Sequence, residues 1–279
     1  MTLATTSTTA TPAPDLAAIK ARQQATWASG DYHVIATQIQ LMSELLIEAL
    51  DVHSTEQLLD VATGSGNAAI AAARRGLSVV GIDYVPALLD RARLRTSAEG
   101  LSIEYLDGDA EALPFDGGAF DVVTSVFGAM FAPNQMKTAD ELVRVTRPDG
   151  RIGLVNHAPD GFIGHVFKTI GRHVPSPAGL ASPLRWGTED GLRDLFGDAI
   201  VELRTTTRQM VLRERSPLTW VRTWRQWYGP IHKAFQAVGP AGEDALESDL
   251  LEVIGRFNRA TDGTMVVPSD YLEAVIVTR

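Results

Sequence analysis

The chain has 279 residues, 45% of them hydrophobic, and a formal net charge of −9 at pH 7. This length suits one large α/β domain with insertions, or a core with a small cap. The acidic balance argues against a surface that follows phosphates, so we expect no nucleic-acid partner. Because the chain has no cysteine, disulfides, a thiolate metal site and a cysteine nucleophile are all excluded.

The N-terminal 50 residues divide into a tail and a helical region. Residues 1–15 are rich in Thr, Ala and Pro and lack the basic and apolar regions of a signal peptide, so we expect a disordered tail and a cytoplasmic protein. Residues 16–50 follow a helical pattern that breaks and restarts at Gly30 and Asp31. No stretch approaches the roughly 18 consecutive apolar residues that indicate a membrane span.

Residues 51–157 alternate short apolar runs with helical stretches, which predicts a parallel sheet joined by right-handed crossovers. The expected strands are Gln57–Val61, Ser78–Asp83, Ser102–Asp107, Phe120–Val126 and Arg151–Asn156. The expected helices are Asn67–Arg75, Pro86–Ser97 and Asn134–Val145. We interpret this region as the cofactor-binding core of a single domain that spans residues 16–279.

After this core the regular alternation of short apolar runs and helical stretches ends. Residues 157–187 contain four prolines and five glycines, so we expect no long helix or strand there. A short helix with Thr188 as its N-cap and a strand over Ala199–Leu212 follow, and YLEAVIVTR predicts a final strand. We interpret residues 158–187 and 213–265 as cap segments over the C-terminal edge of the sheet, where open α/β folds bind their ligands.

A glycine-bearing turn joins the first two expected strands. The sequence QLLDVATGSGNAAIAAARRGLSVVGID reads as strand, turn, helix and strand, and residues 64–69 satisfy the dinucleotide pattern G-x-G-x-x-G/A. Asp83 at the end of the second strand suits a ribose, so an NAD-linked oxidoreductase stays open. Asp60 favours a cationic ligand instead, because its carboxylate would repel a pyrophosphate and attract the ammonium and sulfonium of S-adenosylmethionine. The alternative is that Asp60 only caps the turn.

Another acid follows the third expected strand. Asp109 precedes the small Ala110, so its carboxylate can accept a hydrogen bond from an adenine amino group, with a backbone N–H beside it for a ring nitrogen. A plain turn role for Asp109 is the competing interpretation, because Asp favours turns.

Five motifs in order resemble class I S-adenosylmethionine-dependent methyltransferases, especially the branch of ubiquinone/menaquinone-biosynthesis and related small-molecule enzymes. They read LDVATGSGNAA, GIDYVPALLDRAR, GDAEALPF, FDVVTSVFGAMF and ELVRVTRPDGRIGLV. The resemblance implies a Rossmann-like α/β fold with a seven-stranded, doubly wound sheet of order 3-2-1-4-5-7-6. Its last strand would be antiparallel, with N-terminal helices and a helical cap around it.

The same resemblance implies S-adenosylmethionine as cofactor and a role for each matching residue. The methionine end would contact Asp60, Ala62, Gly64 and Gly66, with Tyr32 over the carboxylate, and Ser125 to Phe127 would lie beside the methionine and the acceptor. The ribose would bind Asp83, the adenine ring Tyr84, and the adenine edge Asp109 and Ala110. Two positions depart from the family pattern, because Ala62 replaces a glycine and RPDG replaces RPGG.

The acceptor side is less well defined by the sequence. His157 follows the fifth strand and is the best candidate for a general base, although a polar loop role competes with catalysis. Trp186, Trp224 and Tyr228 are candidates for lining a pocket for a flat or apolar acceptor, while packing of a cap is the alternative for such aromatic spacing. No cluster of acids indicates a magnesium site, so we expect no metal.

We therefore expect methyl transfer to a small-molecule acceptor, in secondary metabolism or in quinone-like biosynthesis. A non-catalytic S-adenosylmethionine-binding protein is the main alternative, and the NAD-linked oxidoreductase is less well supported. A nucleic-acid methyltransferase is disfavoured by the acidic balance. The nucleophile (O, N or C) and the choice between a monomer and a homodimer are left open.

Overall fold

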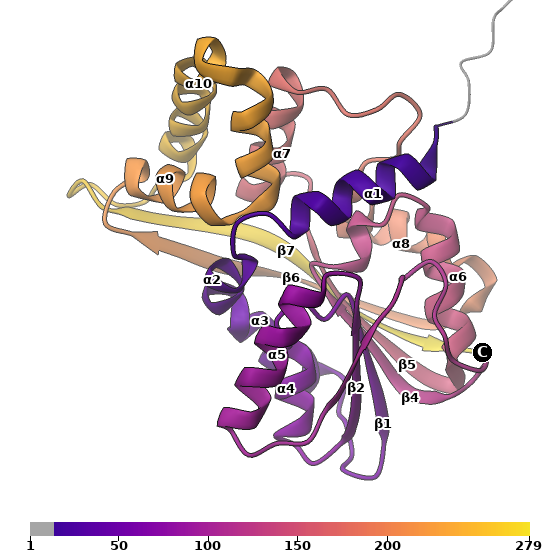
Figure 1. Cartoon of the computed structure of the whole chain (residues 1–279). Coiled ribbons are helices and arrows are strands. Elements are labelled where there is room, and N and C mark those ends of the chain that lie inside the picture. The colour runs from indigo at the N-terminus through magenta and orange to yellow at the C-terminus, as the bar shows by residue number, and fades with distance from the viewer. Residues whose placement is uncertain (1–13) are drawn as a thin grey trace, which may run out of the picture.

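The computed structural model describes residues 14–279 (Figure 1). The predicted tail lies outside the described residues except for Pro14 and Asp15, and Asp15 caps the first helix by accepting a hydrogen bond from the Ala18 N–H at 3.0 Å. Within residues 14–279, no helix is long and apolar enough to cross a membrane. In the same range, no group of three metal-binding side chains is placed to hold an ion.

A seven-stranded sheet forms the centre of the fold, in the order β3-β2-β1-β4-β5-β7-β6. This order is the predicted one, and β7 runs antiparallel to both of its neighbours. The strands β1, β2 and β4 have the predicted bounds, β3 is shorter and β5 begins earlier. The seven strands are β1 Gln57–Val61, β2 Ser78–Asp83, β3 Glu104–Asp107, β4 Phe120–Val126, β5 Thr146–His157, β6 Ile200–Glu214 and β7 Met265–Thr278.

Helices cover both faces of this sheet (Figure 1). One face carries α3 (Gln40–Ala49), α4 (Asn67–Ala73) and α5 (Pro86–Ala98), and the other carries α6 (Gln135–Val145) and α8 (Glu189–Phe196). The predicted N-cap of α8 is confirmed, since the Thr188 hydroxyl accepts a hydrogen bond from the Gly191 N–H at 3.1 Å.

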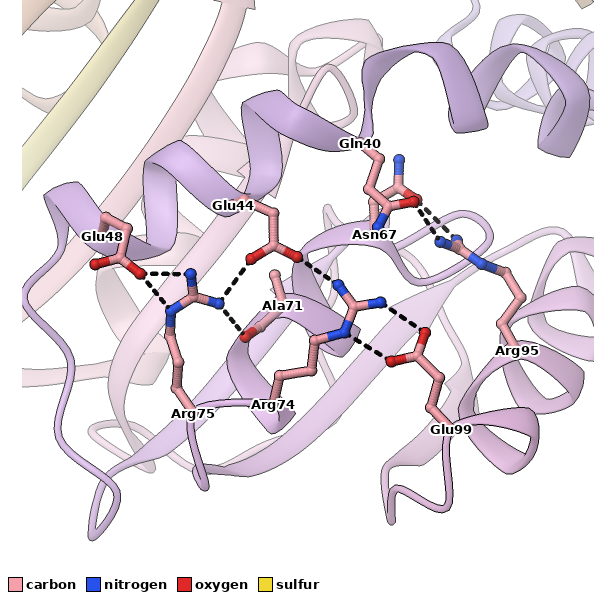
Figure 2. Close-up of polar contacts among 9 residues, drawn as sticks. All are labelled: Gln40, Glu44, Glu48, Asn67, Ala71, Arg74, Arg75, Arg95 and Glu99. Atoms are coloured by element: carbon pink, nitrogen blue, oxygen red, sulfur yellow. Dashed lines mark hydrogen bonds and ion pairs between the residues drawn. The ribbon is translucent and has the colours of Figure 1, made fainter.

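Figure 2 shows how side chains join α3, α4 and α5. Arg75 binds Glu44 and Glu48, while Arg74 binds Glu44 and Glu99. These ion pairs are partly exposed, so each contributes little to stability on its own. Together they connect α3, which precedes β1, with α4 and α5, which follow β1 and β2.

The cap contains a helix that the sequence analysis did not expect. Residues 157–187 include α7 (Phe162–His173), because the prolines of this segment flank the helix and none lies inside it. Interior glycines weaken a helix by about 1 kcal/mol each. Burial of Phe162, Ile163 and Val166 against the rest of the cap offsets that cost.

The other cap helices are α9 (Pro217–Trp227) and α10 (Gly229–Phe257), which bends at Gly239 with φ 62°. The helix α1 (Leu16–Trp27) contacts α10 and is followed by α2 (Tyr32–Ala36) (Figure 1).

The predicted helix break at Gly30 and Asp31 is confirmed. Gly30 has φ 74°, and a Cβ there would lie 2.8 Å from the Trp227 carbonyl oxygen. At Gly229 a Cβ would lie 2.2 Å from the carbonyl oxygen of Thr26. The end of α1 and the α9–α10 junction therefore pack backbone against backbone.

Candidate cofactor and acceptor site

A cavity of about 870 Å³, open on one side, lies at the C-terminal ends of β1, β2 and β4. Its walls come from α1, α2, the glycine turn, and the turns after β2, β3 and β4. Nine of the eleven residues expected at the cofactor line it. They are Tyr32, Asp60, Ala62, Gly64, Asp83, Tyr84, Asp109, Ala110 and Phe127. The residues that the sequence analysis missed include Lys20, Trp27, Thr63, Asn67 and Phe131.

The glycine turn has a left-handed backbone at three positions. Ala62, Gly64 and Gly66 have φ values of 54°, 55° and 86°. Gly66 does not line the cavity, because the position of its missing Cβ points toward the Tyr105 hydroxyl at 2.6 Å. Its role is to let the chain turn into α4 against the core. Ala62 adopts the conformation for which glycine is the commoner residue, at a small local cost.

Arg95 of α5 supports this turn from outside the cavity. Its guanidinium donates to the Ser65 carbonyl at 2.6 Å and to the Asn67 side-chain oxygen at 2.7 Å (Figure 2 shows the second contact). Asn67 in turn donates to the Ala36 carbonyl at 2.8 Å. This chain of bonds holds the end of α2 against the start of α4.

Asp60 is buried and organises the turn. Its carboxylate accepts hydrogen bonds from the hydroxyls of Thr63 at 2.6 Å and Thr124 at 2.9 Å, and from the Ala69 N–H at 3.2 Å. Burial raises its pKa to about 6, although these hydrogen bonds oppose the shift. The capping role considered for Asp60 is thus present in the structure. The carboxylate also lines the cavity, so capping does not remove its charge from the ligand's surroundings.

Asp83 at the end of β2 is held by backbone groups. It accepts hydrogen bonds from the Gly64 N–H at 2.8 Å and the Val85 N–H at 2.9 Å. Burial raises its pKa to about 6 as well, against the effect of these bonds. Each carboxylate oxygen can accept a second hydrogen bond, so Asp83 keeps acceptor capacity for hydroxyl groups.

Asp109, after β3, is bound by a lysine from α1. Lys20 Nζ lies 2.5 Å from Asp109 Oδ2 and 2.5 Å from Glu111 Oε2. The second oxygen of Asp109 accepts the Glu111 N–H at 2.9 Å. The sequence alone gave no signal for Lys20, because α1 lacks an apolar periodicity that would show which face it turns inward.

An aromatic wall closes the other end of the cavity. Trp27 lies 5.6 Å from Tyr32 and 5.0 Å from Phe131, measured between ring centroids. Tyr228 packs behind this wall, 5.7 Å from Trp27, and does not line the cavity. Trp224 and Trp186 are buried elsewhere, Trp224 stacked on Trp220 at 4.6 Å and Trp186 against Phe196 at 5.8 Å. Of the three aromatic residues expected at the acceptor, the structure therefore brings none into the lining.

His157 and Ser125 contact the turn after β4 from the side away from the cavity. The His157 ring stacks on Phe127 at 4.1 Å, does not line the cavity, and has no hydrogen-bond partner at Nδ1. Burial lowers its pKa to about 3, so the ring is neutral. The Ser125 hydroxyl donates to the Val61 carbonyl at 2.8 Å and accepts from the Ala129 N–H at 2.9 Å. Phe127 itself faces the cavity with φ 50°.

Fold and cavity together define an α/β protein with a cavity at the C-terminal edge of its parallel strands, lined by the carboxylates of Asp60, Asp83 and Asp109. Residues 59–154 match the family model described as a methyltransferase domain. The uncharacterized protein Rv1403c of Mycobacterium tuberculosis is 35% identical over 260 residues, which cover 91% of this chain and 94% of that protein. A demethylmenaquinone methyltransferase of Deinococcus radiodurans is 40% identical over 131 residues, covering 46% of this chain and 54% of that protein.

Solved structures show the same fold. The YcgJ protein of a Bacillus species aligns with a TM-score of 0.56 at 19% identity, over 85% of this chain and 98% of that chain. A phosphoethanolamine N-methyltransferase of Haemonchus contortus, solved with S-adenosylhomocysteine, aligns with a TM-score of 0.54 at 17% identity, over 85% of this chain and 52% of that chain. The chain belongs to the class I S-adenosylmethionine-dependent methyltransferases. It is an enzyme of this class, and S-adenosylmethionine is its cofactor.

Proposed function

We propose that the cavity binds S-adenosylmethionine along the strand ends and that the methyl group passes to a small-molecule acceptor at the aromatic wall. The observation that carries this proposal is the placement of Asp60, Asp83 and Asp109 at the ends of β1, β2 and β3 around one cavity. Within the described lining, Lys20 is the one cationic side chain that faces them. Such surroundings attract an ammonium and a sulfonium and repel a pyrophosphate.

The residues at the strand ends fit the parts of this cofactor. The glycine turn and Asp60 would hold the methionine moiety, with Tyr32 over its carboxylate. Asp83 would accept from the ribose hydroxyls, Tyr84 would lie against the adenine, and Asp109 and Ala110 would bind its edge. The bound cofactor supplies a methyl group on a positively charged sulfur, which an in-line nucleophile can displace.

The acceptor end is apolar. Trp27, Phe131, Ile39, Ala132 and Pro133 line it, and Tyr32 is the one ionisable side chain among the described residues there. Burial raises the pKa of Tyr32, so its hydroxyl stays protonated. Among the described residues at this end there is no carboxylate, amide or cationic side chain to pair with a charged acceptor, which would therefore be desolvated without compensation. An uncharged, flat acceptor fits this wall better than an amine, a carboxylate or a phosphate.

We further propose that catalysis depends on alignment and on exclusion of water, with no side-chain base at the acceptor. His157 is buried, neutral and stacked beneath Phe127, so its role is to support the ring that faces the ligand. The bound cofactor would supply the methyl group to a nucleophile that the aromatic wall holds in line with it. A proton released by that nucleophile would leave through the open side of the cavity. Proximity of this kind alone provides large accelerations.

Thermal shift and product release test the proposal. S-adenosylhomocysteine should raise the melting temperature and NAD should not. Formation of S-adenosylhomocysteine should then be faster with uncharged phenols and quinols than with primary amines or carboxylates. Stabilisation by NAD alone would refute the cofactor placement. Binding of S-adenosylhomocysteine without turnover of any of these acceptors would refute the acceptor class proposed here. We propose that the acceptor belongs to quinone-like biosynthesis or to another branch of secondary metabolism.

A further inference from the structure

One face of α1 lies along the cavity. Lys20, Gln24 and Trp27 are spaced i, i+4 and i+7, so their side chains share a side of the helix. Lys20 reaches Asp109, Gln24 donates to the Tyr84 carbonyl at 2.5 Å, and Trp27 forms the aromatic wall. At about 1.5 Å per residue, this face spans about 10 Å, from the adenine side toward the acceptor side.

The two ends of α1 are docked differently. Its C-terminal end packs through Trp27 in the aromatic wall and through the Thr26 carbonyl against Gly229. Its N-terminal half, where Lys20 lies, has only Ile19 buried, and a segment with so few apolar contacts belongs to the parts of a fold that open most easily. Polar contacts therefore decide whether this half of α1 is closed over the cavity.

The strongest of these contacts is the set formed by Lys20, Asp109 and Glu111, which we call the Lys20 clasp. The Glu111 side chain is only 6% exposed, and its other oxygen accepts the Asn134 N–H at 2.7 Å. Burial alone would lower the pKa of Lys20, but its contacts with the two carboxylates outweigh burial and raise it. The lysine is thus charged at neutral pH and separates two carboxylates that would otherwise repel each other.

We propose that Lys20 is a positioning residue that closes α1 over the bound cofactor, and that the cofactor leaves when the Lys20 clasp opens. This inference rests on the cofactor placement proposed above. Asp109 can serve the clasp and the adenine amino group together, because each carboxylate oxygen accepts two hydrogen bonds. Closure then raises the residence time of the cofactor without adding a contact to the reacting atoms.

The test is the dissociation rate of S-adenosylhomocysteine, measured by stopped-flow fluorescence on the full chain. K20M should dissociate about tenfold faster, the usual effect of losing a hydrogen bond to a charged group. K20R should stay within about threefold of the wild type, because the charge is kept. K233M is the matched control, since Lys233 does not line the cavity and its side-chain hydrogen bond in the described structure is to Gln236, and its rate should not change.

Salt separates the clasp from a general loss of structure. Raising NaCl from about 50 mM to about 500 mM should accelerate dissociation from the wild type and leave K20M unchanged, because the partly exposed ion pair is screened. Q24A removes an uncharged contact on the same face, so it should accelerate dissociation and keep the salt effect.

Three results would overturn the inference. K20M could dissociate at the wild-type rate, K20M could keep the full salt effect, or Q24A could leave the rate unchanged. An unchanged rate in Q24A would overturn the inference even if K20M does not fold, because Q24A is a separate variant. If the wild type does not bind S-adenosylhomocysteine at all, both the proposed cofactor site and the role of the Lys20 clasp are wrong. If the wild type binds it normally and the variants dissociate at the wild-type rate, only the role of the clasp is wrong.

Discussion

Replacing Asp83 with alanine should weaken cofactor binding while leaving the fold in place. In the structure its carboxylate is 7% exposed and accepts two backbone N–H bonds, from Gly64 and Val85. These two donors lose their partner in D83A whether or not the cofactor is present, so most of that cost cancels in the binding equilibrium. What remains is the loss of the bonds from the ribose hydroxyls to a charged acceptor.

That remaining loss should be about 1–3 kcal/mol, which corresponds to about a 5-fold to 150-fold weaker dissociation constant. Isothermal titration with S-adenosylhomocysteine at pH 8 measures it, because Asp83, with a pKa of about 6, is then ionised. Circular dichroism reports whether the turn and the sheet persist.

Asp90→Ala is the matched control. Asp90 lies on α5, is 73% exposed and pairs with Arg93, so its removal should leave the dissociation constant within about twofold. If D83A is folded and binds S-adenosylhomocysteine as tightly as the wild type and D90A do, Asp83 does not hold the ribose and the orientation proposed for the cofactor is wrong.

The remaining predictions concern pH, His157 and Trp27. Burial raises the pKa values of Asp60 and Asp83 in the folded protein to about 6, above the ordinary aspartate value of 3.8, so the folded apo-protein binds protons more tightly than the unfolded chain. Their contribution to the free energy of unfolding is therefore greatest below pH 4 and lost as pH rises to about 6. Affinity for S-adenosylmethionine should show the opposite trend, rising from pH 5 to pH 7, with protons released on binding. Calorimetry in buffers of different ionisation enthalpy measures this proton release, and an affinity that falls over the same range would contradict the prediction. H157F should keep activity within about threefold, because Phe fills the stack on Phe127 and leaves no hydrogen bond unmade at Nδ1. A loss above about 100-fold, together with loss of the acid limb of the pH–rate profile, would restore His157 as the base. Trp27→Ala should raise the acceptor KM at least about tenfold, as loss of a packed aromatic ring does. An unchanged acceptor KM would place the acceptor elsewhere.

The cavity lining at the ends of β1 and β2 could be predicted from the sequence because local chemistry fixes it. Asp60 and Asp83 end short apolar runs, and parallel strands bring their C-terminal ends to one edge. The bounds of β1, β2 and β4 followed from the same pattern. Asp109 needed the resemblance to a known family, since an acid in a turn has several ordinary explanations.

The acceptor half could not be predicted, because its residues are brought together by docking of helices. Trp224 and Tyr228 have the spacing of a helix face, but a face packed inside the cap and one that lines a cavity look alike in sequence. Trp27 and Lys20 lie on a helix with no apolar stripe, so only its docked position shows that they face the cavity. The helix α7 was missed because the proline and glycine content was counted over the whole segment, whereas the prolines lie outside the helix and its apolar residues bury one face.

The backbone contacts at Gly30 and Gly229 have a consequence for turnover. At both positions the missing side chain lets a carbonyl group of the other segment approach closer than a Cβ would allow, so the end of α1 and the α9–α10 junction form one closely packed unit. The α9–α10 junction should therefore travel with α1 as one lever when the cavity opens. Acceptor exit and cofactor exchange would then share one opening event, and an acceptor held against Trp27 would delay the departure of the spent cofactor. A single opening movement, which releases the methylated acceptor and the spent cofactor together, would then limit the rate of turnover.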